Sequence, residues 1–267
     1  MGDNTKIEWT DATWNPITGC TKVSPGCAHC YAERLSVRYN RDFAPWIPRN
    51  AHWVVDIRNT LDTYLIPKGW RKPRKIFVCS MSDLFHELVP DDIIKNVWTT
   101  MELCPQHLFL ILTKRPERMR EWVNSLYGPG LQTAPLQNVW LGVSVENQLW
   151  AERRIPILLQ TPAAKRFVSC EPLLGPVDLR PWLGSDCCFE RREFGRCHCI
   201  WQGLDWVICG GESGPKARPM NLDWARSLRD QCLEAGVPYF LKQLGGWPDK
   251  RGGEKAVLDG RLWHEEP

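Results

Sequence analysis

The chain has 267 residues, enough for one α/β barrel-like domain or two small domains, with 43% hydrophobic and 24% charged residues. No apolar run is long enough to span a bilayer, and the polar first six residues lack the apolar core of a signal peptide. We therefore expect a protein of the cytoplasm with no membrane partner. The net charge of +3 is too small to indicate a nucleic-acid partner by itself.

A cysteine-rich loop comes early in the chain, after a short strand expected over Ile7 to Thr10. Its three cysteines have the spacing C-x6-C-x2-C and are Cys20, Cys27 and Cys30. A helix predicted from Ala28 to Arg38 places its N-terminus beside the loop, where its partial positive charge favours thiolates. No fourth cysteine follows before Cys79.

The number of thiols in this loop leaves more than one hypothesis open. Structural zinc sites and ordinary iron–sulfur clusters take four protein ligands. Three thiolates suggest a [4Fe–4S] cluster with one iron open to another molecule. A zinc site that borrows His29 or a distant ligand is the alternative, and unligated thiols are a third hypothesis.

Residues 41–73 are rich in proline and are expected to be irregular, with a helical fragment near Ile57 to Leu65. Apolar runs and amphipathic helices then alternate. The runs are Lys75–Cys79, Leu108–Leu112, Asn138–Gly142, Arg166–Ser169, Trp206–Cys209 and Val237–Leu241. The helices are Asp91–Leu103, two that end near Leu126 and Leu159, and Leu222–Glu234. Counted with the N-terminal segment, the seven candidate strands predict an α/β fold, a partial (β/α) barrel of parallel strands; a doubly wound open sheet is the alternative.

Polar residues follow nearly every apolar run. They are Ser80, Ser82, Asp83, Thr113, Lys114, Ser144, Glu146, Asn147, Ser169, Glu171, Glu212, Ser213, Lys242 and Gln243. Because the carboxyl ends of parallel strands carry the active site in such folds, we expect these side chains to converge on one rim. The alternative for some of them is a structural role, since Glu171 and Glu212 can cap helices or pair with Lys114 or Lys242.

Two further segments set the domain organisation. An insertion over residues 184–204 contains Cys187, Cys188, Cys197 and Cys199, which bind an additional zinc ion or iron–sulfur cluster or form a reduced loop without metal. Residues 1–244 are the expected barrel, and residues 245–267 are a C-terminal extension. A hairpin is predicted around Asp259-Gly260 in that extension.

The cysteine loop resembles that of radical S-adenosylmethionine (SAM) enzymes, in which the first gap is usually shorter. The stretches Trp-Thr-Asp-Ala-Thr-Trp-Asn-Pro and Ser-Pro-Gly-Cys-Ala-His-Cys-Tyr-Ala-Glu resemble a phage and bacterial family of radical-SAM-like proteins with unassigned substrate. The similarity extends along nearly the whole chain. It implies a [4Fe–4S] cluster and SAM as cofactors, with reductive cleavage of SAM to methionine and a 5′-deoxyadenosyl radical. It also implies a six-strand type of partial barrel.

The same resemblance suggests roles for individual residues. Cys20, Cys27 and Cys30 would hold the cluster. The expected SAM contacts are Ser80, Ser82, Asp83, Ser144, Glu146, Asn147, Gly210, Gly211 and Glu212. The segment from Ser80 to Asp83 departs from the usual Gly-Gly-Glu type of motif at that place. The candidate catalytic residues are Lys114, Glu171 and Lys242, of which Lys114 would meet the SAM carboxylate or a substrate phosphate.

A nucleic acid or nucleotide is the expected substrate. Fifteen tryptophans and a loose similarity to spore photoproduct lyases favour it, as do two basic clusters. The clusters are Lys68, Arg71, Lys72, Arg74 and Lys75, and Lys114, Arg115, Arg118 and Arg120. Expected partners are a reductant such as flavodoxin or ferredoxin, DNA or RNA, and a partner protein. The competing hypotheses are a zinc-containing nucleic-acid-binding protein without radical chemistry and a SAM-binding scaffold that has lost catalysis.

Overall fold

The structure is a computed structural model that describes residues 5–38, 64–127, 134–184 and 203–267. The four cysteines of the insertion, and nearly all of the helical fragment expected over residues 57–65, lie outside these ranges. Residues 64–69 are helical.

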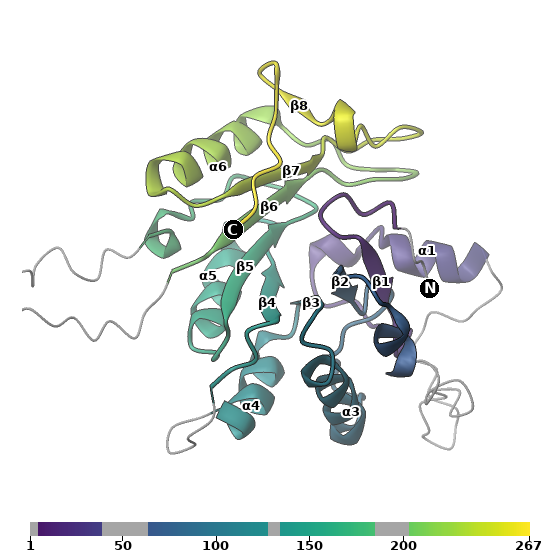
Figure 1. The fold of residues 1–267 in the computed structure, drawn as a ribbon. Coiled ribbons are helices and arrows are strands. Elements are labelled where there is room, and N and C mark those ends of the chain that lie inside the picture. The colour runs from purple at the N-terminus through teal and green to yellow at the C-terminus, as the bar shows by residue number, and fades with distance from the viewer. Residues whose placement is uncertain (1–4, 39–63, 128–133, 185–202) are drawn as a thin grey trace, which may run out of the picture.

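A single seven-stranded parallel sheet forms the centre of the molecule (Figure 1). Its strands are β1 (Ala12–Trp14), β2 (Lys75–Val78), β3 (Leu108–Thr113), β4 (Val139–Ser144), β5 (Lys165–Cys170), β6 (Trp206–Gly210) and β7 (Tyr239–Gln243). The strands are hydrogen-bonded in chain order, from β1 to β7, and the sheet curls into a half-barrel. This order confirms the partial (β/α) barrel and excludes the doubly wound sheet, in which the strand order would reverse at a switch point.

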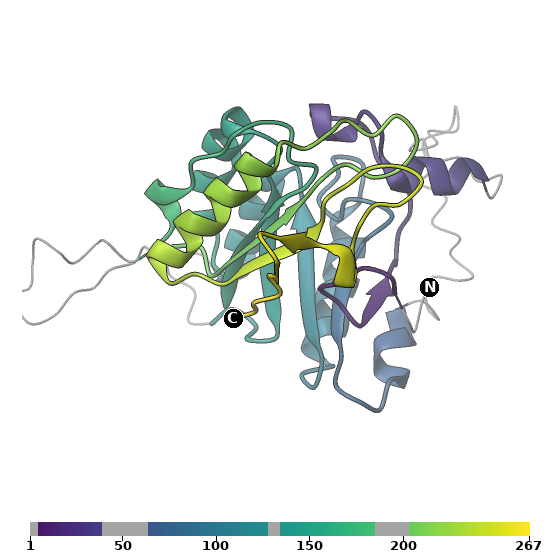
Figure 2. The ribbon, with the colours of Figure 1, turned by 90° about the horizontal axis from the view of Figure 1, so that it is seen from above.

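The helices that connect the strands lie on the outer, convex side of the half-barrel (Figures 1 and 2). They are α3 (Asp91–Glu102), α4 (Pro116–Tyr127), α5 (Gln148–Leu159) and α6 (Leu222–Ala235). The predicted helices correspond closely to these four. Among the described residues, none of the helices combines the length and the apolar character needed to cross a membrane.

The N-terminal region differs from the sequence prediction in two places. The strand expected over Ile7 to Thr10 is wrong, because the Thr10 N–H donates to the Ile7 carbonyl over 3.1 Å and closes a turn. The strand is Ala12–Trp14 instead. The helix after the cysteines, α1 (Tyr31–Arg38), starts three residues later than expected, because a 3₁₀ turn over Pro25–Cys27 precedes it.

Side chains alternate between the two faces of the half-barrel, as the two-residue period of a strand requires. One set packs under the helices, while the inner face carries an aromatic cluster. That cluster contains Trp9, Phe77, Leu110, Phe167, Trp206, Ile208 and Phe240. Gly142 of β4 makes room for it, since a Cβ there would lie 2.6 Å from the Phe167 ring. The interior of the half-barrel is therefore filled below the strand ends.

The C-terminal extension packs on the same core. Its hairpin, β8 (Val257–Leu258) and β9 (Arg261–Leu262), turns at Asp259 and Gly260, both with positive φ, which confirms the predicted turn. The chain then runs along β7, where the Leu241 N–H donates to the Trp263 carbonyl over 2.6 Å. The extension thereby covers the edge strand of the sheet.

The ends of the insertion lie side by side. Leu183 and Leu204 form a bridge, and the Leu204 N–H donates to the Trp182 carbonyl over 2.9 Å. The chain before the insertion and the chain after it therefore lie together.

Candidate functional site at the strand ends

A cavity of about 550 Å³ opens at the carboxyl ends of the strands. This volume lies within the range of small-molecule sites. Its wall includes polar residues from the ends of β3, β4, β5 and β7: Lys114, Ser144, Ser169, Glu171, Lys242 and Gln243. The predicted convergence of strand-end residues on one rim is thus present in the structure.

The cysteine loop, defined here as residues 15–30, lies across this rim. Cys27 and Cys30 line the cavity, whereas Cys20 lies outside its wall with its sulfur 3.5 Å from an Arg115 nitrogen. Burial, reinforced by Asp83, raises the pKa of Cys20 to about 11. Burial also opposes ionisation of Cys27, but Lys114 and backbone N–H groups lower its pKa below the usual value.

Three partly buried free thiols from one loop match, in number and type, the protein ligands of a [4Fe–4S] cluster with one open iron. Each thiol in such a cluster binds a different iron, so the three sulfurs face one cluster and do not share one ion. Within the described ranges, no group of three or more His, Cys, Asp or Glu side chains is arranged to hold a single metal ion.

Asp83 holds the first part of the cysteine loop through Arg115. The buried carboxylate accepts from the Thr113 hydroxyl at 2.7 Å, from the Lys114 N–H at 3.1 Å and from the Arg115 guanidinium at 3.2 Å. The Phe85 N–H also donates to it. Four donors from the chain itself occupy Asp83, so the structure indicates a positioning role for this predicted SAM contact.

Arg115 joins Asp83 to the cysteine loop. Its guanidinium donates to the Thr21 hydroxyl at 2.7 Å and to the Thr21 carbonyl at 3.3 Å. His86 contacts the same hydroxyl through Nε2 at 2.7 Å. The Leu88 N–H donates to Nδ1 of His86, so Nε2 carries the proton of the neutral ring. Burial and the neighbouring Arg115 lower the pKa of His86 and favour this neutral form.

Glu146 holds the middle of the loop. Its fully buried carboxylate accepts from the Ser24 hydroxyl at 2.6 Å and from Arg154 at 3.1 Å, and it lies 3.5 Å from the Lys114 ammonium. Gly26 passes so close that a Cβ there would lie 2.5 Å from the Glu146 Cγ. The glycine is therefore required by the approach of the loop to this carboxylate.

Glu212 holds the end of the loop. Arg218 donates to it through Nε at 2.9 Å and through its backbone N–H at 2.8 Å, and His29 Nδ1 lies 3.0 Å away. Burial opposes ionisation, but these hydrogen bonds lower the pKa of Glu212 to about 2. Arg218 also donates to the Pro25 carbonyl at 2.9 Å. The carboxylate thus fixes two points of the loop.

Several other predicted cofactor contacts are occupied within the chain. The Ser80 hydroxyl donates to Asn15, and the Ser82 hydroxyl donates to the Ile17 carbonyl. The Asn147 side chain caps α5 by accepting from the Trp150 N–H.

The glycine pair after β6 is packed against the chain itself. A Cβ at Gly211 would lie 2.3 Å from the Leu244 carbonyl oxygen, and one at Gly210 would lie 3.3 Å from the Glu171 side chain. These close approaches explain the glycines without a ligand.

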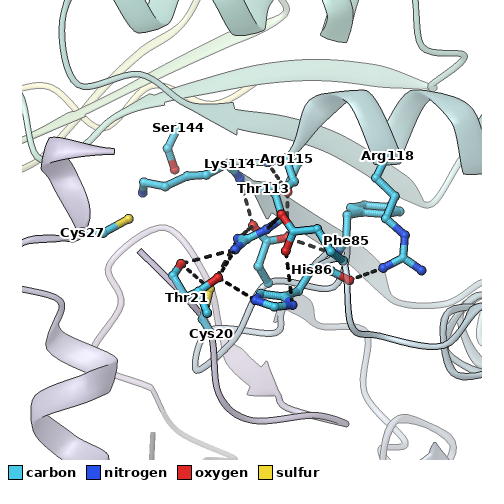
Figure 3. Close-up of polar contacts among 12 residues, drawn as sticks. Cys20, Thr21, Cys27, Phe85, His86, Thr113, Lys114, Arg115, Arg118 and Ser144 are labelled. Atoms are coloured by element: carbon cyan, nitrogen blue, oxygen red, sulfur yellow. Dashed lines mark hydrogen bonds and ion pairs between the residues drawn. The ribbon is translucent and has the colours of Figure 1, made fainter. Parts of the chain in front are cut away.

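Several of the predicted residues line the cavity, including Ser80, Gly211 and Glu212, whose contacts within the chain are given above. The Lys242 ammonium contacts both carboxylate oxygens of Glu171, at 2.7 and 2.8 Å, which matches one of the expected pairs. Ser144 and Ser169 are register neighbours on β4 and β5, and both line the cavity with Lys114. Figure 3 shows the Lys114 amine near the Cys27 sulfur and below Ser144.

The second basic cluster is not a surface patch. Arg115 is buried, Lys114 faces the cavity, and Arg118 donates to the carbonyls of His86 and Val89 and pairs with Asp91. Arg115 and Arg118 hold the fold, so they give no support to phosphate binding at the surface. In the first cluster, Lys68, Arg71 and Lys72 are exposed.

The basic partners of the strand-end carboxylates were not among the predicted site residues. Arg115, Arg154 and Arg218 each follow a strand end by a few residues or sit on the next helix. A polar residue after a buried strand is visible in the sequence, but its ion-pair partner depends on the folded geometry. From the sequence, an arginine within a helix, such as Arg154, is expected at the protein surface, although the structure shows it to be buried.

No curated protein and no solved structure shows significant similarity to this chain. The model of one family, described as "Protein of unknown function (DUF5131)", matches residues 4–267. That match covers nearly the whole half-barrel, the cysteine loop and the C-terminal extension. The chain belongs to the DUF5131 family.

Proposed function

We propose that the protein is a radical SAM enzyme that acts on a nucleic acid or nucleotide, in its modification or repair. The observation that carries the proposal is the position of the cysteine loop, with three free thiols, across the open end of a parallel half-barrel. The chemistry supplied by a bound cluster is one-electron reductive cleavage of SAM to give a 5′-deoxyadenosyl radical.

Different residues of the chain have different proposed roles. Cys20, Cys27 and Cys30 would hold the cluster, and the three carboxylates that fix the loop would keep these thiols in place. The cavity below the loop is the proposed place for SAM and substrate. A substrate that fills this cavity would displace water from it, which would protect reactive species from side reactions.

Lys114 and the Glu171–Lys242 pair are the proposed catalytic groups. Their side chains are partly buried, at 21%, 19% and 11% exposure, and they line the cavity. A partly buried, charged pair such as Glu171 and Lys242 costs desolvation energy at the end of two strands. Binding or orienting a polar ligand is a use that offsets this cost.

Electrons would come from a reductant such as flavodoxin or ferredoxin. The exposed residues Lys68, Arg71 and Lys72 are the remaining support for contact with DNA or RNA, and a partner protein is a further proposal. We place the protein in the cytoplasm, where the eight described free cysteines stay reduced.

The test is anaerobic. The full chain is reconstituted with iron and sulfide, reduced with dithionite and given SAM, and 5′-deoxyadenosine is measured by mass spectrometry with electron paramagnetic resonance on the same sample. A SAM-dependent change of the cluster signal together with deoxyadenosine supports the proposal. Cys27→Ala should abolish the cluster absorbance, while Cys104→Ala, a buried thiol on the outer side of the sheet, should retain it.

Two outcomes contradict the proposal. A cluster that does not respond to SAM leaves an electron-transfer or scaffold role. A colourless protein with stoichiometric zinc and salt-dependent DNA binding establishes the zinc-containing nucleic-acid-binding protein instead.

A further inference from the structure

Two polar atoms in the cavity wall have no hydrogen-bond partner among the described residues. They are Nε1 of Trp9 and Oγ of Ser169. Both residues line the cavity, and they are only 2% and 1% exposed. Roughly nine in ten buried polar groups in proteins are hydrogen-bonded, so these two atoms are places where a ligand would supply the missing partner.

The two residues lie in adjoining layers of the inner face. The Trp9 ring packs 6.1 Å from the ring of Phe167, measured between centroids. Ser169 is two residues further along β5 from Phe167, on the same face of the strand. The unpartnered atoms therefore belong to one part of the cavity, the cavity floor, which we define as Trp9, Phe77, Leu112 and Ser169.

The chemistry of these atoms restricts the ligand. An indole N–H only donates, so the ligand atom at Trp9 must be an acceptor, whereas the Ser169 hydroxyl either donates or accepts. Phe77 and Leu112 add apolar surface beside the donors, and the Phe77 and Trp9 rings lie 4.8 Å apart between centroids. The cavity floor itself has no charged side chain.

Three of the four lysines in the cavity wall lie beside a glutamate. Lys242 pairs with Glu171 at 2.7 Å, and Lys250 pairs with Glu8 at 2.6 Å. Lys114 lies 3.5 Å from the Glu146 carboxylate. Lys6 also lines the cavity and forms no ion pair among the described residues, but none of the four lysines belongs to the cavity floor. An uncharged group fits the floor better than a phosphate or carboxylate.

We propose that the cavity floor binds a nucleobase of the substrate, which packs on Phe77 and Leu112 and is hydrogen-bonded by Trp9 Nε1 and Ser169 Oγ. A nucleobase is a flat, uncharged ring with acceptor atoms at its edge, and aromatic side chains stack on it. This inference rests on the proposed function for the identity of the substrate. It places the substrate base deep in the half-barrel, below the cysteine loop.

The test measures binding without any radical chemistry. Isothermal titration of the full chain as purified, without added iron or SAM, would use adenosine, guanosine, cytidine, uridine and thymidine as probes. Trp9→Phe keeps an aromatic ring but removes the N–H, and Ser169→Ala removes only the hydroxyl. Each variant should weaken the Kd of the preferred nucleoside about three- to ten-fold, the usual effect of one hydrogen bond between neutral groups.

The matched controls remove an indole N–H and a serine hydroxyl at positions outside the cavity wall. Trp247 is 64% exposed, and Ser125 is exposed on α4, so Trp247→Phe and Ser125→Ala should leave the Kd unchanged. Circular dichroism and thermal melting establish that each variant is folded. If Trp9→Phe does not fold, the comparison of Ser169→Ala with Ser125→Ala still decides the result.

A competition arm separates the substrate base from the adenine of SAM. Excess S-adenosylhomocysteine should leave nucleoside binding intact if the cavity floor belongs to the substrate. Displacement of the nucleoside would assign the floor to the cofactor and overturn the inference. No nucleoside binding, or variants that bind as the parent does, would overturn it too. A failure to form 5′-deoxyadenosine would refute the proposed function while leaving this binding result intact.

Discussion

Glu212→Gln tests whether the strand-end carboxylates hold the cysteine loop. The amide has nearly the shape of the protonated acid, so the variant removes the charge and little else. In the native protein the carboxylate is 5% exposed and is hydrogen-bonded by Arg218 and His29. We expect the free energy of unfolding at neutral pH to fall by about 2 to 3 kcal/mol.

The magnitude follows from the pKa. The pKa of Glu212 falls from its ordinary value of 4.5 to about 2, which corresponds to ~3 kcal/mol of preference for the charged form in the folded protein. Arg218 is 34% exposed, and water takes up part of its lost interaction, so we expect a value below this limit.

The pH dependence has a definite sign. A lowered pKa stabilises the protein above the unfolded value of 4.5, and this stability is lost as the pH falls toward 2. About 1 kcal/mol of the difference between the native protein and the Glu212→Gln variant should therefore be gone at pH 4. Urea denaturation followed by tryptophan fluorescence at pH 7 and pH 4 measures it.

Glu254→Gln is the matched control, because Glu254 is exposed at the protein surface. It should change the free energy of unfolding by no more than about 0.5 kcal/mol. The reasoning is refuted if Glu212→Gln costs less than about 1 kcal/mol at pH 7, or if its cost is the same at pH 4 as at pH 7.

Two further substitutions test the other points at which the loop is held. Gly26→Ala should lower the free energy of unfolding by about 1 to 3 kcal/mol in urea denaturation, because the new Cβ would lie 2.5 Å from the Glu146 side chain. Gly69→Ala is the control: Gly69 has open space around it, so this variant should be as stable as the parent or more stable. An unchanged stability in Gly26→Ala would show that the loop does not need this close approach. Arg115→Met should free the segment after Cys20, so tryptic cleavage at the exposed Lys22, measured by mass spectrometry, should become faster. Cleavage at the parental rate would show that the contact of Arg115 with Thr21 does not hold this segment.

The fold could be predicted because its signals are local. Each strand from β2 to β7 is an apolar run of a few residues, and each of the four connecting helices has an amphipathic pattern. The first strand was misplaced because Ile7 and Trp9 alternate with polar residues as a strand would. Trp9 instead turns inward and fills the half-barrel, where its burial depends on Phe77 and Trp206 from distant parts of the chain.

The sequence predicted which residues lie at the candidate site but not which of them hold the cysteine loop and which face the cavity. The sequence shows Asp83, Glu146 and Glu212 after three strands, and nothing local distinguishes them from Glu171. The structure distinguishes them by their partners, because an arginine faces each of the first three, whereas Glu171 pairs with Lys242 inside the cavity. Such pairings join residues that only the fold brings together.

The cysteine loop needs the buried carboxylates because it has little regular secondary structure of its own. Between β1 and α1 the loop has only one three-residue 3₁₀ turn, so it cannot keep three thiols in place by its own hydrogen bonds. Buried carboxylates at the ends of β2, β4 and β6 supply the missing contacts at the start, middle and end of the loop. The ends of β5 and β7 make no such contact with the loop, which leaves Glu171 and Lys242 as the charged groups to be tested first for chemistry.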